Sequence, residues 1–172
     1  MTSYKRSFVA VHWVHALLLG FMLIGASLGL PDLPAKGGDL SAFKGHMILG
    51  VITTLVVALR LWMLRSQPEM APLKVSSFRA SLVRWNHRLI YLFIIIVGVS
   101  GLATAQSASL GQVLIFGSDA SVYSGPEGIT GTLGSVHGAS TTILMILIAM
   151  HIAGVVSYRI KTGECILKRM WF

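Results

Sequence analysis

One apolar stretch close to the end of the chain, residues 135–159, limits what the protein can fold into more than any other feature. It reads SVHGASTTILMILIAMHIAGVVSYR and is long enough to cross a bilayer as one helix. His137 lies near one end and His151 near the other, fourteen residues apart. A helix would separate them by roughly 21 Å along its axis and by about 40° around it. The stretch therefore predicts a transmembrane helix with two histidines on one face, one near each membrane surface.

Histidines inside a membrane are candidates for a functional site, because a buried imidazole is costly unless it has a partner. Two imidazoles stacked across a bilayer are naturally partnered by a pair of redox cofactors. The remaining question is whether the rest of the chain supplies a second histidine at each of these two depths.

The composition is that of a membrane protein. The chain has 172 residues, of which 54% are hydrophobic and only 12% charged, with a mean hydropathy of +0.75. These values predict one membrane domain, residues 1–172, in contact with lipids. The net charge of +8 would suggest nucleic acid in a soluble protein. In a membrane protein it reflects basic cytoplasmic loops, so we expect no nucleic-acid partner.

Hydropathy predicts four spans, at about 7–30, 43–64, 83–105 and 135–158. The predicted fold class is an all-α membrane protein, a bundle of four transmembrane helices. All Lys and Arg residues except Lys36 and Lys44 lie at the N-terminus, in the second loop, at the C-terminus or at the adjoining helix ends. The positive-inside rule therefore predicts that both termini are cytoplasmic.

This orientation gives each histidine a depth. The outer level contains only His46 and His137, which form one bis-imidazole site. The inner level offers three partners for His151, namely His12, His15 and His87. A haem b held by two histidines fits both levels, because bundle helices place cofactors between facing helices and haem iron takes one axial ligand from each side. A structural zinc ion would need about four ligands at one point.

Arginines near the inner surface are candidates for binding cofactor carboxylates. Most of the basic cluster there, which includes Arg88, consists of interface anchors, but one or two members are expected to pair with carboxylates of the inner haem. Arg60 lies closer to the membrane interior. It is the best single candidate for that pairing or for contact with a quinone.

Motifs on all four spans resemble the bacterial cytochrome b561 family. They are His12-Trp13 on the first span, His46 with Gly50 and Arg60-Leu61-Trp62 on the second, His87-x-x-x-Tyr91 with Gly98 and Gly101 on the third, and His137 with His151 on the fourth. The pattern is most similar to the short, four-helix, di-haem members of the inner membrane, one of which acts as a superoxide oxidase. Longer relatives serve as cytochrome subunits of hydrogenases and other dehydrogenases.

The resemblance implies specific roles for matching residues. It implies two haem b groups, the inner one bound by His12 and His151 and the outer one by His46 and His137. His87 matches a histidine that is not an axial ligand and lies beside a haem propionate or a quinone. Tyr158 stands where the quinone headgroup would be expected, although the residue type differs.

The expected function is transmembrane electron transfer in the bacterial inner membrane. Single electrons would pass between the outer face and membrane ubiquinone, with superoxide or a periplasmic redox protein as the outer partner. The expected enzyme activity is that of a superoxide:ubiquinone oxidoreductase. One alternative is an electron-transfer subunit serving a dehydrogenase or a soluble redox partner. An alternative from another class is a haem-free transporter with a path lined by histidines, which predicts a colourless protein.

Overall fold

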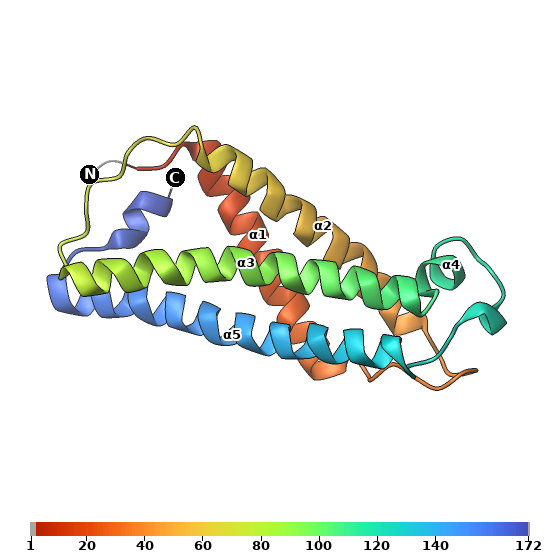
Figure 1. The fold of residues 1–172 in the computed structure, drawn as a ribbon. Helices are drawn as coiled ribbons and strands as arrows, with labels where there is room; N and C mark the ends of the chain where they lie inside the picture. Colours follow the sequence, from red (N-terminus) through yellow and green to blue (C-terminus); the bar gives the residue numbers. More distant parts are fainter. Residues whose placement is uncertain (1–2, 172) are drawn as a thin grey trace.

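The computed structural model describes residues 3–171 and consists of helices and connecting loops (Figure 1). Its four long helices are α1 (Arg6–Gly29), α2 (Ser41–Leu64), α3 (Ser77–Ser107) and α5 (Ile129–Thr162). Each is long and apolar enough to cross a membrane. No β-strand occurs in the described part of the chain. The predicted fold class, a bundle of four membrane-spanning helices, is confirmed.

The helices are arranged as two pairs. Helices α3 and α5 lie side by side along most of their length, and α1 packs against α2 (Figure 1). Contacts between α2 and α3 join the two pairs, and the α1–α2 pair leans away from the α3–α5 pair. The two histidines of α5 face α2 and α3, since the ring of His137 contacts that of His46 and the ring of His151 contacts that of His87.

Large apolar side chains cover the outside of the bundle. Leu17 is 72% exposed, Leu28 84% and Ile160 77%, whereas few residues of each helix are buried. A helix that is apolar on all sides gains nothing from exposing this surface to water, but it is well solvated by lipid tails. The surface is therefore that of a membrane-embedded protein.

The ends of α3 and α5 extend beyond the spans predicted from hydropathy. Helix α3 begins six residues before residue 83, where the Ser76 side chain accepts a hydrogen bond from the backbone N–H of Arg79. Helix α5 ends at Thr162 and is capped by Gly163, whose φ of 69° is the left-handed conformation that favours glycine. Hydropathy detects the apolar part of a helix, and these polar caps lie outside it.

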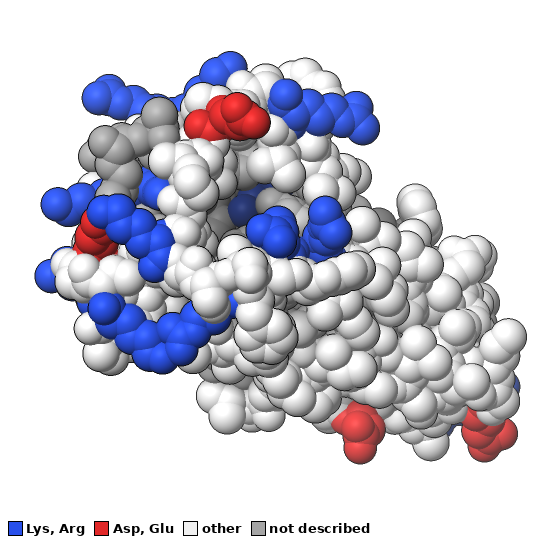
Figure 2. All heavy atoms as spheres, turned by 60° about the vertical axis from the view of Figure 1, so that its left-hand side comes forward, with Lys and Arg blue, Asp and Glu red and all other residues white. Residues whose placement is uncertain are grey.

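The two ends of the bundle differ in charge and construction. Both chain termini lie at one end, here called the terminal end, where the backbone N–H of Tyr4 donates to the carbonyl of Arg169 at 3.2 Å. Figure 2 shows that Lys and Arg side chains gather over this end. After α5, the short 3₁₀-helix η2 (Ile166–Met170) folds back toward α1.

The opposite end, here called the cap end, is closed by the two loops that meet there. The longer loop contains a short helix, α4 (Leu110–Leu114), and a 3₁₀-turn, η1 (Ala120–Val122). Tyr123 is 1% exposed and donates its hydroxyl hydrogen to the carbonyl of Pro34 at 2.8 Å. Both loops thus pack as one layer over the cap end.

Candidate functional site

At the cap end, α2 and α5 bring two histidines face to face. His46 lies in the second turn of α2 and His137 lies in the third turn of α5. Their ring centres are 6.1 Å apart and their ring planes are nearly perpendicular, at 84°. Both side chains are half-buried. The structure thus brings together the two residues predicted to form the outer site.

The His137 ring is held in one orientation by α3. Its Nδ1 lies 2.9 Å from the carbonyl oxygen of Val97 and 3.4 Å from the Ser100 hydroxyl oxygen. A carbonyl can only accept, so Nδ1 carries the proton and donates it to Val97. The lone pair of His137 is therefore on Nε2, the tautomer of a histidine that ligates metal through Nε2.

Gly101 makes this orientation possible. A Cβ atom at Gly101 would lie 2.9 Å from Cε1 and 3.0 Å from Nδ1 of His137, inside van der Waals contact. The His137 ring therefore packs on the bare backbone of α3. In contrast, a Cβ atom at Gly138, directly after His137, would meet nothing within 4 Å.

At the terminal end, the ring in contact with His151 is that of His87. Their ring centres are 4.9 Å apart and the planes are at 89°. His87 lies on α3, and its Nδ1 donates to the carbonyl of Val83 at 2.7 Å, which leaves its lone pair on Nε2. Sequence reasoning treated His87 as one of three possible partners of His151, and the structure places its ring in contact with that of His151.

Arg60 joins the other two terminal-end histidines. Its Nη2 is 2.8 Å from Nδ1 of His12, and its Nη1 is 3.4 Å from Nδ1 of His15. Because a guanidinium has donors only, both imidazoles accept through Nδ1 in this arrangement. The guanidinium also lies over the rings of Phe8 and Tyr91, at 5.7 Å and 5.4 Å.

Two buried nitrogen atoms in this group have no hydrogen-bond partner. They are Nε of Arg60 and Nε2 of His15, whose side chain is only 1% exposed. Sequence reasoning proposed a cofactor or quinone contact for Arg60 but did not detect that one arginine binds two histidines. The spacing of His12 and His15, three residues apart on one helix face, was the available signal.

Two further predicted site residues lie apart from the histidines. Arg88 is exposed and stacks on the ring of Trp85, with its guanidinium carbon 5.3 Å from the ring centre. Tyr158 is buried and donates its hydroxyl hydrogen to Glu164 at 3.2 Å. Lys74 binds the other carboxylate oxygen of Glu164 at 2.7 Å. These two hydrogen bonds hold the pKa of Glu164 below its ordinary value, with that from Lys74 the larger cause.

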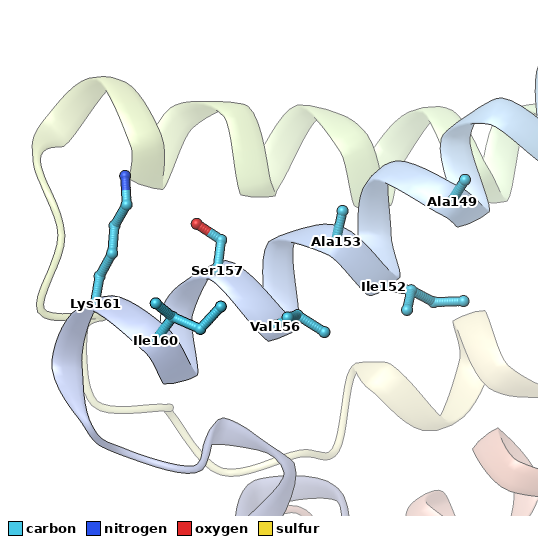
Figure 3. A pocket seen from close by; sticks show the side chains of 7 residues that line it. All are labelled: Ala149, Ile152, Ala153, Val156, Ser157, Ile160 and Lys161. Atoms are coloured by element: carbon cyan, nitrogen blue, oxygen red, sulfur yellow. The ribbon is translucent and has the colours of Figure 1, made fainter.

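A shallow hollow of about 630 Å³ lies on α5 (Figure 3). It is lined by Ala149, Ile152, Ala153, Val156, Ser157, Ile160 and Lys161. At about 100° per residue, His151 lies on the opposite side of the helix from the centre of this group. The hollow is therefore part of the outward, apolar face of α5 and not part of the histidine site.

The donor set fits a haem better than a bare metal ion. In residues 3–171, no group of three or more His, Cys, Asp or Glu side chains could hold a metal ion. A haem supplies the equatorial ligands itself and needs only axial ones from the protein. Since a metal–imidazole bond is about 2 Å long, two imidazoles on one metal have ring centres roughly 6 Å apart. The 6.1 Å spacing of His46 and His137 meets this requirement, whereas the 4.9 Å spacing of His87 and His151 is direct ring contact.

The chain matches the model of a known protein family. The family model described as prokaryotic cytochrome b561 matches residues 3–172, which is nearly the whole chain. No curated protein and no solved structure matches the chain significantly.

Proposed function

The chain belongs to the prokaryotic cytochrome b561 family, whose members are membrane-bound b-type cytochromes that transfer electrons, and we propose that it carries electrons across the membrane between two haem b groups. The observation that carries this proposal is the His46–His137 pair, spaced for one iron and held with the Nε2 lone pair of His137 free. A second haem would lie at the terminal end, around His151. Each haem would supply a reversible one-electron couple of its iron.

The terminal-end ligands are proposed to be His12 and His151, as the resemblance implies. Ligation by Nε2 of His12 requires a proton on its Nδ1, whereas in the structure that atom accepts from Arg60. Arg60 must therefore turn away from His12 when the site is filled. A cofactor carboxylate would attract the guanidinium, because charge-assisted pairs with arginine are strong and often bidentate. His87 would then remain beside the haem, held by Val83.

The proposed orientation places the terminal end in the cytoplasm of a bacterial inner membrane. Its support is the positive-inside rule together with the gathering of Lys and Arg over that end (Figure 2). The outer haem would then face the periplasm. Helix α5 joins both levels, because His137 and His151 are fourteen residues, or roughly 21 Å, apart on it.

Ubiquinone is the proposed partner on the membrane side, near Tyr158. Reduction of a quinone to a quinol consumes two electrons and two protons. The hydroxyl of Tyr158 and the carboxylate of Glu164 form a polar pair at the terminal end that can hold such a proton.

Superoxide is the finer proposal for the outer donor, and it rests on the resemblance to superoxide-oxidising relatives. One superoxide would lose one electron to the outer site and leave as oxygen, so two superoxides supply the electrons for one ubiquinol. The alternative, favoured by no single contact, is an electron-transfer subunit that receives electrons from a dehydrogenase or a soluble redox protein. Stopped-flow mixing of superoxide with the oxidised protein separates them, since only the first predicts direct haem reduction.

The experiment that tests the di-haem proposal is haem quantification in single variants. We expect two haem b groups per purified chain, and one after His46→Ala or His137→Ala, with the remaining haem unchanged in its reduced spectrum. A colourless wild-type protein would refute the proposal and favour a haem-free transporter. Loss of both haems from a folded single variant would refute separate sites.

A further inference from the structure

Arg169, on the 3₁₀-helix after α5, is a buried cation that the proposed function does not use. Its residue is only 9% exposed. Its Nη1 donates to the carbonyl of Ala71 at 2.7 Å, while its Nε has no hydrogen-bond partner. A buried charge is expensive unless it is paired with an opposite charge and its donors are satisfied.

No carboxylate of the described chain pairs with Arg169. The one ion pair in residues 3–171 joins Lys74 and Glu164. Glu164 is close enough for its pKa to be lowered slightly by Arg169, but its oxygens are bonded to Lys74 and Tyr158. Among the described residues, Arg169 therefore has no carboxylate partner, and one of its N–H groups is unpaired inside the terminal end.

The surroundings connect Arg169 with the proposed inner haem site. Its carbonyl accepts from the backbone N–H of Tyr4, and the Tyr4 ring lies 5.2 Å from that of Phe8. The guanidinium of Arg60 lies over this same Phe8 ring. Arg60 also has an unpaired Nε. Arg169, through its backbone carbonyl, and Arg60, through its guanidinium, thus both contact the Tyr4–Phe8 pair, and the Nε of each is buried and unpaired.

The segment that carries Arg169 is held against the first turns of α1. The indole N–H of Trp13, directly after His12, donates to the carbonyl of Met170 at 2.7 Å. The rings of Trp13 and Trp171 are in edge contact, with centres 6.0 Å apart. These contacts place residues 169–171 beside the part of α1 that bears His12.

We infer that Arg169 is a second carboxylate-binding residue of the terminal-end haem site, so that residues 163–171 form part of that site. The ligand is an anionic carboxylate, because the free Nε edge of a guanidinium is suited to charge-assisted pairing with one. Arg169 is a binding residue for the cofactor and takes no part in electron transfer itself. The inference rests on the proposed function, since it requires a haem at the terminal end.

Potentiometric titration of the purified holoprotein tests this inference without an activity assay. A nearby positive charge stabilises the reduced haem relative to the oxidised haem, so Arg169→Gln should lower the inner midpoint potential. We expect about a tenfold change in the ratio of oxidised to reduced haem, which is about 59 mV for one electron. The outer potential should not move. Arg169→Lys should give a smaller shift, because it keeps the charge but loses the planar fork.

The matched control is Lys168→Gln, which removes the same charge from the exposed neighbouring residue. It should leave both potentials in place. A second arm uses apoprotein reconstituted with haem dimethyl ester, whose carboxylates are neutral. Arg169→Gln and Arg169→Lys should lower the affinity of the terminal-end site for native haem but not for the ester, because only native haem offers a charged carboxylate to the arginine.

Three results would overturn the inference while leaving the di-haem proposal intact. They are an unchanged inner potential in Arg169→Gln with both haems bound, an equal shift in Lys168→Gln, and a loss of haem affinity in Arg169→Gln that is equally large with the ester. If Arg169→Gln does not fold, the comparison of Arg169→Lys with wild type on both haems gives the same decision. A wild-type protein without haem would instead refute the proposed function itself.

Discussion

Substitution of Gly101 by alanine is expected to release the outer haem while leaving the inner one in place. The new Cβ would lie 2.9 Å from Cε1 and 3.0 Å from Nδ1 of His137. Ordinary van der Waals contact begins at about 3.4 Å. The imidazole must therefore move by several tenths of an ångström away from α3, and this movement lengthens its 2.9 Å hydrogen bond to Val97.

The size of the effect follows from two contributions. Overpacking a well-packed position costs about 1–3 kcal/mol when the neighbours must shift. Loss of a hydrogen bond that orients a metal-ligating histidine costs about 10–100-fold in metal affinity. We therefore expect the affinity of the outer site for haem to fall about 10–100-fold. The inner site should keep its affinity, since His151 is roughly 21 Å farther along α5.

The assay is haem content by pyridine haemochrome, together with reduced-minus-oxidised spectra of the purified variant at several haem supplies. Gly138→Ala is the matched control, because it adds the same methyl group next to His137 in open space. It should bind both haems like the wild type. The reasoning is refuted if Gly101→Ala keeps a full, spectrally unchanged outer haem, or if Gly138→Ala loses it equally.

Three further predictions follow from other contacts. Tyr123→Phe removes a buried hydroxyl that ties the two cap-end loops, and unfolding in denaturant should show a loss of about 0.5–1.5 kcal/mol. Glu164→Gln should lower the Tm at neutral pH, because it removes the ion-pair partner of Lys74. Folding lowers the pKa of Glu164 from its ordinary value of 4.5. The difference in Tm between the variant and the wild type should therefore shrink as the pH falls below 4.5 and Glu164 becomes protonated in the folded protein. His12→Ala should lose the inner haem, whereas His87→Ala should retain it with a shifted potential.

Each of these has a result that would contradict it. An unchanged denaturation midpoint in Tyr123→Phe would show that the cap-end hydrogen bond adds nothing to stability. For Glu164, the control is Glu69→Gln on the same end of the bundle, and an equal Tm loss there would show that the ion pair is not the cause. Retention of the inner haem in His12→Ala, with its loss in His87→Ala, would assign His87 as the axial ligand.

The four spans could be predicted because apolar length is written directly in the sequence. The cap-end site could also be predicted, since His46 and His137 are the only histidines at that depth. Neither the carbonyl of Val97 nor the ring packing on Gly101 could be found in this way, because a backbone group leaves no residue signature. Short elements such as α4 were missed because five residues are too few to show a helical period.

The terminal end was harder to predict because it offers more than one pairing. Four histidines lie at that depth, and the sequence alone left three partners for His151. The structure sorts them by contact, with His87 at the ring of His151 and His12 at Arg60. The return of the C-terminal segment to Trp13 depends on a backbone acceptor at Met170, so residue types alone could not indicate it.

The most direct test of the central claim is electron paramagnetic resonance of the oxidised protein with spin quantification. The account predicts two low-spin ferric signals per chain, as expected for two haems with two imidazole ligands each. The nearly perpendicular rings of His46 and His137, at 84°, predict a strongly anisotropic signal for the outer haem, which His137→Ala should abolish. A single low-spin signal, or a high-spin ferric haem in the wild type, would contradict the pairing of histidines at two levels.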